Sequence, residues 1–257
     1  MKRICIVLAA LLLLSLCHPV SANGQALVLY KTWSPDDGWV RYSYYTSYYW
    51  DEFRDKLEEM GWTADFARHV DSNSINNYDV LFVLTPYEDI PDGERQTIID
   101  WVENGGNMVI SQDDGALYSN ELTRPFGMTF GADHTFTVND FNSHAITNGV
   151  SMVTSEDGSV IETSGDSNGL GYFDGSEGSE CLLAINESAG KGTVVAIGEE
   201  SMWKDGTIGE NDNELLLENI LNYYASPTSV PEFTPLTMAF SIIALMGMVL
   251  FLIGREK

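Results

Sequence analysis

The sequence predicts an α/β domain with a doubly wound, mostly parallel sheet. Strand-like and helix-like segments alternate along residues 23–225, and short links join them. The clearest strand is the unbroken apolar run Val-Leu-Phe-Val-Leu at 80–84, which is typical of a parallel strand covered on both faces. Between such runs, apolar residues recur at helical spacing, as at Phe53, Leu57 and Met60. We therefore expect helices on both faces of a single sheet.

The N-terminal half supplies most of this alternation. Its first helix begins near Trp50 and ends at Gly61, since glycine commonly terminates a helix. Its second helix opens at Pro91 and is stopped by the glycine pair after Asn104. The strands expected around these helices are 26–30, 63–67, 80–84 and 108–111.

The C-terminal half is less regular. A helix at 115–126, broken at Pro125, precedes a stretch at 127–180 that is rich in Gly, Ser, Asp and Asn. This composition predicts irregular structure with short β pieces at 135–138 and 159–163. The elements expected after it are paired strands at 181–186 and 193–197 and a closing amphipathic helix at 213–224.

Both ends of the chain carry patterns that indicate export and anchoring. Lys2 and Arg3 precede an unbroken apolar run, and small residues up to Ala22 complete a secretory signal peptide, so we expect residues 1–22 to be removed. The segments expected at the other end are a Pro/Ser/Thr linker at 226–235, a membrane-spanning helix at 236–254 and a basic cytoplasmic tail at 255–257. The domain at 23–225 is then exported and displayed at the cell surface, outside the cytoplasmic membrane.

The linker contains a motif that leaves two interpretations of the anchor open. Pro231-Glu232-Phe233, placed before an apolar helix and a basic tail, resembles the archaeal PEF-CTERM sorting tails. That resemblance implies that an archaeosortase-type processing enzyme cuts the tail and that a lipid anchor replaces it. The other interpretation is a single-pass protein that keeps its C-terminal helix in the membrane.

The composition is strongly acidic. The formal net charge is −25 at pH 7, with 38 Asp and Glu residues against 13 Lys and Arg. Such a surface repels phosphate backbones, which argues against nucleic acid as a partner. The same charge suits a cationic partner, a salty medium or divalent cations. The sequence also lacks zinc-ligand spacing, a phosphate-binding loop and a dinucleotide fingerprint.

Six segments follow one another in an order that matches a known family. They are 78–83, 91–106, 107–111, 144–150, 190–198 and 213–224. Together they resemble the class I glutamine amidotransferase-like fold, which is flavodoxin-like, and within it a non-catalytic branch of DUF4350 and GldG-type domains. The matching motifs are mostly structural, so the resemblance implies more about fold than about function.

The resemblance also makes a prediction about catalysis. It implies that catalytic members carry a cysteine on the turn after a central strand and a histidine after a late strand. Here the first turn, 111–115, has no cysteine, and the second segment, 199–203, has no histidine. Cys181 falls within an expected strand, where it is interpreted as a small buried residue, and His144 is interpreted as structural. The chain therefore lacks the amidotransferase triad.

Acidic and aromatic residues follow the expected strand ends, where open α/β sheets bind ligands. The candidate ligand-binding residues are Trp33, Asp36, Asp37, Trp39, Asp113, Asp114, Glu199 and Glu200. Oxygen ligands from different loops suit calcium, so Asp113, Asp114 and Glu199 form a candidate calcium site. Aromatic faces beside carboxylates also suit a glycan. The alternatives are carboxylates that are simply solvated and aromatic residues that pack their own loop.

These observations predict a non-catalytic module, anchored at the membrane, that binds a glycan, another extracellular ligand or a surface protein. Calcium is its one candidate cofactor. One alternative is an envelope glycan hydrolase that uses strand-end carboxylates as acid and base. Another, implied by the GldG-type resemblance, is an accessory extracellular domain of an ABC-type transport complex.

Overall fold

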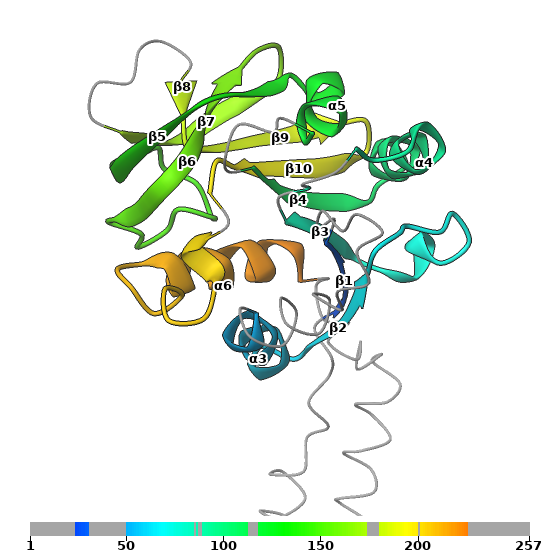
Figure 1. The fold of residues 1–257 in the computed structure, drawn as a ribbon, viewed down its shortest axis with the longest axis horizontal. Helices are drawn as coiled ribbons and strands as arrows, with labels where there is room; N and C mark the ends of the chain where they lie inside the picture. The colour runs from blue at the N-terminus through cyan, green and yellow to red at the C-terminus, as the bar shows by residue number, and fades with distance from the viewer. Residues whose placement is uncertain are drawn as a thin grey trace, which may run out of the picture. The chain divides into compact units, whose positions relative to one another are not determined.

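The computed structural model describes residues 24–30, 50–84, 86, 89–112, 118–173, 180–199 and 201–225. Within these residues one ten-stranded sheet forms the frame of the domain, in the order β2-β1-β3-β4-β10-β9-β7-β5-β6-β8 (Figure 1). Its strands are β1 (Gly24–Tyr30), β2 (Trp62–Ala67), β3 (Val80–Leu84), β4 (Asn107–Ser111), β5 (Met128–Phe141), β6 (Val153–Thr163), β7 (Asn168–Phe173), β8 (Glu180–Cys181), β9 (Leu183–Ala189) and β10 (Gly192–Ile197). The helices are α3 (Asp51–Glu59), α4 (Asp92–Glu103), α5 (Asn120–Thr123) and α6 (Asn213–Tyr224), with short 3₁₀ turns η1 (Ile75–Asn77), η2 (Arg124–Phe126) and η3 (Ser201–Trp203).

One half of the sheet is parallel. Strands β2, β1, β3, β4 and β10 pair side by side in the same direction. Their carboxyl ends therefore meet at one edge of the sheet, which we call the carboxyl edge. All five side chains of β3 are buried, as the unbroken apolar run predicts for a strand covered on both faces.

The other half is antiparallel. β5 and β6 form a long antiparallel pair of 14 and 11 residues. β7 lies between β5 and β9, and β9 pairs antiparallel with β10. β10 is thus the strand at which pairing changes from parallel to antiparallel.

The antiparallel half curls back toward the end of β10. The Ser159 N–H of β6 donates to the Gly198 carbonyl at 2.6 Å, although β9, β7 and β5 separate β6 from β10 in the sheet. The Gly198 N–H in turn donates to Leu182 O at 2.8 Å. A Cβ on Gly198 would lie 1.9 Å from Ser159 O, so this approach requires glycine.

Each face of the sheet has its own apolar core. On one face, α3 and α6 pack with η3 (Figure 1), and the Phe53 ring stacks on Trp203 at a centroid distance of 5.9 Å. The edge of Phe53 also meets Phe82 of β3 at 5.3 Å. On the other face, α4 and α5 cover the sheet through residues such as Ile98 and Leu122.

A single cation joins the two helices of the first face. Lys56 of α3 contacts the carboxylates of Glu214 and Glu218 on α6, the latter at 3.1 Å, and also Glu59 on its own helix at 2.9 Å. Burial by itself lowers the pKa of Lys56, but the hydrogen bonds that its ammonium donates to these three carboxylates raise the pKa overall above its ordinary value. The ammonium is therefore charged and fixes α3 against α6.

The expected doubly wound, mostly parallel sheet is wrong. The sheet is mixed, because half of its strands are antiparallel, and the flavodoxin-like, amidotransferase-like fold class is overturned with it. The error arises in 127–180, which the sequence patterns describe as irregular but which contains most of the antiparallel strands. Among the β5 side chains that the structure describes, those of Met128, Phe130 and Val138 are the buried ones. So little burial leaves only a weak alternating signal.

Several individual elements are nevertheless confirmed. The strands and helices expected in the N-terminal half form at the expected places, and the closing helix is α6. The expected pair of late strands is the antiparallel pair β9 and β10. Of the expected helix at 115–126, the described part forms only the single turn α5 and the 3₁₀ turn η2.

The segments expected at the two ends lie outside the described residues. These are the signal peptide at 1–22, the linker at 226–235, the membrane-spanning helix at 236–254 and the tail at 255–257. Among the helices that the structure does describe, none combines the length and the apolarity needed to cross a membrane.

The start of β10 is packed with no room for a side chain. A Cβ on Gly192 would lie 2.0 Å from Gly106 O and 2.4 Å from Val102 O, and both are backbone atoms that cannot rotate away. Gly93 provides the opposite case within α4, because a Cβ there would meet nothing within 4 Å.

We expect Gly192→Ala to destabilise the domain by about 1–3 kcal/mol or more, since β10 must move away from α4 and β4. The matched Gly93→Ala variant should be neutral or gain up to about 1 kcal/mol from better helix propensity. Urea unfolding of the two variants and the wild type measures both effects. Equal stability of Gly192→Ala and the wild type would contradict the packing described here.

Candidate functional site

The candidate ligand-binding residues follow the strand ends that form the carboxyl edge. Of these, Glu199 alone lies within the described residues. The residues outside are Trp33, Asp36, Asp37, Trp39, Asp113, Asp114 and Glu200, together with the sorting motif Pro231, Glu232 and Phe233. The convergence of acidic and aromatic residues at this edge therefore stays a prediction.

Glu199 follows β10 directly and is turned into the fold. Its side chain is 1% exposed, and its Oε1 accepts a hydrogen bond from the Ser201 N–H at 2.7 Å. This bond satisfies a backbone donor at the start of η3, whose Met202 and Trp203 belong to the core. The position of Glu199 at the carboxyl edge is as expected, and its described contact is structural.

The turn after β4 is held by a small buried network. The Gln112 N–H donates to Ile197 O at 3.1 Å, which ties this turn to the end of β10. The Gln112 Oε1 accepts from the Ser119 N–H at 3.2 Å, and the Ser119 hydroxyl donates to Ser111 O at 2.9 Å. All three side chains are buried. The first residues of the turn that would carry an amidotransferase nucleophile thus bind the backbone of the fold.

Further polar groups connect the antiparallel half to α5 and to the end of β10. The Ser159 hydroxyl donates to Asp133 Oδ1 at 3.0 Å, next to the backbone bond between Ser159 and Gly198. The Asn120 side chain of α5 bonds both ways with Phe130 of β5, donating to its carbonyl at 2.9 Å and accepting from its N–H at 2.6 Å. These contacts join β5 and β6 to the elements around β4 and β10.

Cys181 is fully buried in β8, and the interpretation of it as a small buried residue is confirmed. Burial raises the pKa of its thiol to about 12, so the reactive thiolate is scarcely populated near neutral pH. Its sulfur lies 3.5 Å from the Ile161 carbonyl of β6. Cys181 is therefore poorly suited to act as a nucleophile.

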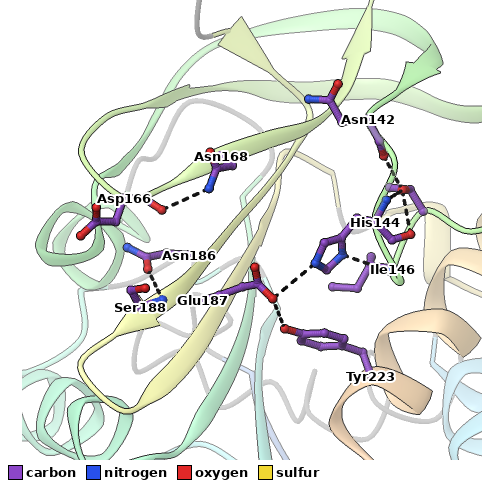
Figure 2. A network of polar contacts seen from close by, with 10 residues as sticks. Asn142, His144, Ile146, Asp166, Asn168, Asn186, Glu187, Ser188 and Tyr223 are labelled. Atoms are coloured by element: carbon purple, nitrogen blue, oxygen red, sulfur yellow. Dashed lines mark hydrogen bonds and ion pairs between the residues drawn. The ribbon is translucent and has the colours of Figure 1, made fainter.

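Three titratable groups meet away from the carboxyl edge, and Figure 2 shows them together. Glu187 of β9 accepts a hydrogen bond from the Tyr223 hydroxyl of α6 at 2.5 Å, and His144 Nε2 lies 3.5 Å from the same carboxylate oxygen. His144 Nδ1 accepts from the Ile146 N–H at 3.2 Å. The group fastens the loop before β6 to both β9 and α6. The interpretation of His144 as structural agrees with these contacts.

Sequence reasoning missed Glu187 and Tyr223. The two residues stand 36 positions apart, and no motif in the sequence links them. They meet only because β9 and α6 are neighbours in the fold. No pattern in the sequence alone signals such a pairing.

The described residues include no cluster of three or more His, Cys, Asp or Glu side chains that could hold a metal ion. The candidate calcium site consists of Asp113, Asp114 and Glu199, and its two aspartates lie outside these residues. Glu199 by itself offers calcium one carboxylate that already accepts a backbone hydrogen bond. The calcium site stays a prediction.

The contact between Glu187 and Tyr223 predicts a small pH dependence of stability. The hydrogen bond from Tyr223 lowers the pKa of Glu187, burial opposes this, and the bond with His144 lowers the pKa further. A carboxylate with a depressed pKa stabilises the fold above its unfolded pKa of about 4.3, and that stabilisation is lost as the pH falls through the folded pKa.

We expect the stability advantage of the wild type over Glu187→Gln to shrink as the pH falls from about 5 to about 3. Because Glu187 is 53% exposed, the advantage should stay below about 1 kcal/mol. Thermal unfolding at a series of pH values measures it. Glu58→Gln is the control, since the exposed Glu58 side chain has no bonding partner among the described residues. A constant difference between wild type and Glu187→Gln across this range would rule out the coupling.

Comparison with solved structures shows what the fold resembles. The N-terminal domain of mmIFT52 aligns with a TM-score of 0.65 at 12% identity, covering 79% of this chain and 98% of that domain. A putative ThuA-like protein from Bacteroides uniformis aligns with a TM-score of 0.56 at 14% identity, covering 82% and 94%. A β-galactosidase from Rahnella sp. aligns with a TM-score of 0.51 at 16% identity, covering 77% of this chain and 31% of the enzyme. At such identities the similarity is one of fold alone.

Sequence comparison gives the family. No curated protein matches the chain. The model of a family described as a domain of unknown function, DUF4350, matches residues 53–221, which is well over half of the chain. The matched region runs from α3 to α6 and includes every strand of the sheet except β1. The chain therefore belongs to the DUF4350 family.

Proposed function

We propose that the protein is a non-catalytic module, displayed outside the cell and anchored to the cytoplasmic membrane, that binds an extracellular ligand or partner protein at the carboxyl edge. The observation that carries this proposal is the buried network at the turn after β4. Gln112, Ser119 and Ser111 use their polar groups to join β4 and α5 to the end of β10. Because these polar groups are used in hydrogen bonds within the fold, they stabilise the carboxyl edge as a binding surface and do not supply a nucleophile.

The location of the binding surface rests on topology and composition. Ligands of open sheets with parallel strands bind outside the carboxyl ends of those strands. In this chain the loops after β1 and β4 begin at that edge and carry Trp33, Trp39 and Asp113 among the candidate residues. Aromatic rings beside carboxylates suit a glycan or the polar surface of a protein. Calcium bound by Asp113, Asp114 and Glu199 would add positive charge to this acidic edge.

The anchoring part of the proposal rests on the two ends of the sequence. The N-terminal segment has the features of a signal peptide, and the motif Pro231-Glu232-Phe233 precedes an apolar stretch and a basic tail. We extend the proposal to a PEF-CTERM-type tail that an archaeosortase-type enzyme removes. The GldG-type resemblance adds one candidate partner to this proposal. That partner is an ABC-type transport complex, which the domain would contact on the outer face of the membrane.

Binding is tested with the full-length chain in detergent, offered separately to immobilised glycan and protein fractions of its own cell envelope. We expect saturable retention by one fraction, reduced at least about tenfold by Trp39→Ala and by Asp113→Asn. Asp55→Asn is the matched control, because Asp55 lies midway along α3 and its side chain is 72% exposed. Retention that none of the edge variants alters, or release of sugars from the glycan fraction, would contradict the proposal.

Anchoring is tested by the intact mass of the protein recovered from its native membrane. We expect a chain that begins near Asn23 and ends near Pro231, carrying the added mass of a lipid. A chain that runs from Asn23 to Lys257 would exclude processing and leave a plain single-pass anchor. Recovery of the mature chain without either anchor would contradict attachment to the membrane.

A further inference from the structure

A cavity of about 330 Å³ lies at the edge of the sheet opposite the carboxyl edge. It is formed where four segments meet: the end of α4, η2 with Gly127, the turn between β6 and β7, and the end of β9 with the turn into β10. Figure 2 shows Asp166, Asn186 and Ser188, three of the lining residues. The volume is at the small end of ligand pockets, so the cavity suits a compact molecule.

Hydrogen bonds between the four segments fix the walls. The Ser164 N–H donates to Gly127 O at 2.8 Å, and the Lys191 N–H donates to Glu103 O at 3.0 Å. The Asn186 amide donates to Phe126 O at 2.9 Å and accepts from the Ser188 N–H at 2.7 Å. Asn186 is buried and fully used in this way, although it begins the glycosylation sequon 186–188. The cavity is therefore preorganised by its own backbone.

The cavity contains charges of both signs that are not paired with each other. Arg124 lines it together with Glu103 and Asp166. Within the described part of the chain, none of these three side chains makes an ion pair. An arginine beside two carboxylates in an acidic protein ordinarily pairs with one of them. All three residues are exposed, so both signs of charge are available to a ligand.

The chemistry of the lining excludes the simpler ligands. The two carboxylates disfavour a plain anion, and Arg124 disfavours a metal ion, in agreement with the absence of a metal-binding cluster among the described residues. A sugar would require an aromatic face for stacking, and the sole aromatic residue of the lining, Phe126, is 4% exposed. A ligand that carries both an anionic and a cationic group satisfies all three charged side chains.

We propose that this cavity binds a zwitterion of the size of a free amino acid or a dipeptide. The Arg124 guanidinium holds the carboxylate of the ligand, and Asp166 with Glu103 holds its ammonium group. Ser188 and the backbone of the surrounding turns complete the polar lining. The site lies at the opposite edge of the sheet from the binding edge proposed above and does not depend on it.

The test uses the full-length chain in detergent and isothermal titration with each of the twenty L-amino acids and with L-alanyl-L-alanine. We expect saturable binding of at least one of these probes, weakened at least about tenfold by Arg124→Gln. Arg54→Gln is the matched control, since it removes the same charge from α3 and should leave binding unchanged. Unchanged unfolding temperatures of both variants show that the fold is retained.

Blocked derivatives of the best probe separate the two halves of the site. The N-acetyl derivative lacks the ammonium group, so the double variant Glu103→Gln, Asp166→Asn should bind it as well as it binds the free probe. The amide derivative lacks the carboxylate, so its weak binding should not fall further in Arg124→Gln. Absence of saturable binding by every probe, or Arg124→Gln binding as tightly as the wild type, would overturn the proposal.

Discussion

The structure depends on β10, because this one strand takes part in two kinds of pairing. On one side β10 pairs with β4 and is the last strand of the parallel half. On the other side it pairs with β9, the first strand of the antiparallel half. Because β10 has a partner strand on each side, its position cannot change without separating the two halves. The backbone contacts at Gly192 and Gly198 keep both ends of β10 against α4 and β6. The carboxyl edge and the charged cavity lie at the two ends of this same strand.

The few basic residues of this acidic protein have different roles. Basic residues are scarce in a chain with 13 Lys and Arg against 38 Asp and Glu, so each one has a large influence on its surroundings. Lys56 is used to join two helices and is enclosed by three carboxylates. Arg124 has no such partner within the described residues and faces the cavity. One basic residue, Lys56, thus stabilises the packing of two helices, and another, Arg124, is available to bind a ligand.

The extent to which the fold could be predicted follows from how much of each strand is buried. β3 is buried at every position, so its five apolar residues predict it, whereas β5 has exposed positions along much of its described length, and the sequence predicts only the short piece 135–138 within it. The helices α3, α4 and α6 were predictable because their buried faces repeat at helical spacing. The contact between Glu187 and Tyr223 and the closure of the cavity by four distant turns depend on tertiary structure and leave no local pattern. Glu199 directly follows β10, but its buried bond to Ser201 could not be predicted from its position in the sequence.

The place of α6 in the core has a consequence for how the domain acquires its structure during synthesis. Leu217 and Ile220 of this last described helix pack in the same cluster as Phe53 of α3, the first. The part of this face that α6 covers thus remains exposed until the ribosome has released residues near 224, and the nascent chain carries exposed apolar surface until then. Folding is therefore completed late and as a unit, and a chaperone that shields this face during elongation would act on the region between α3 and α6.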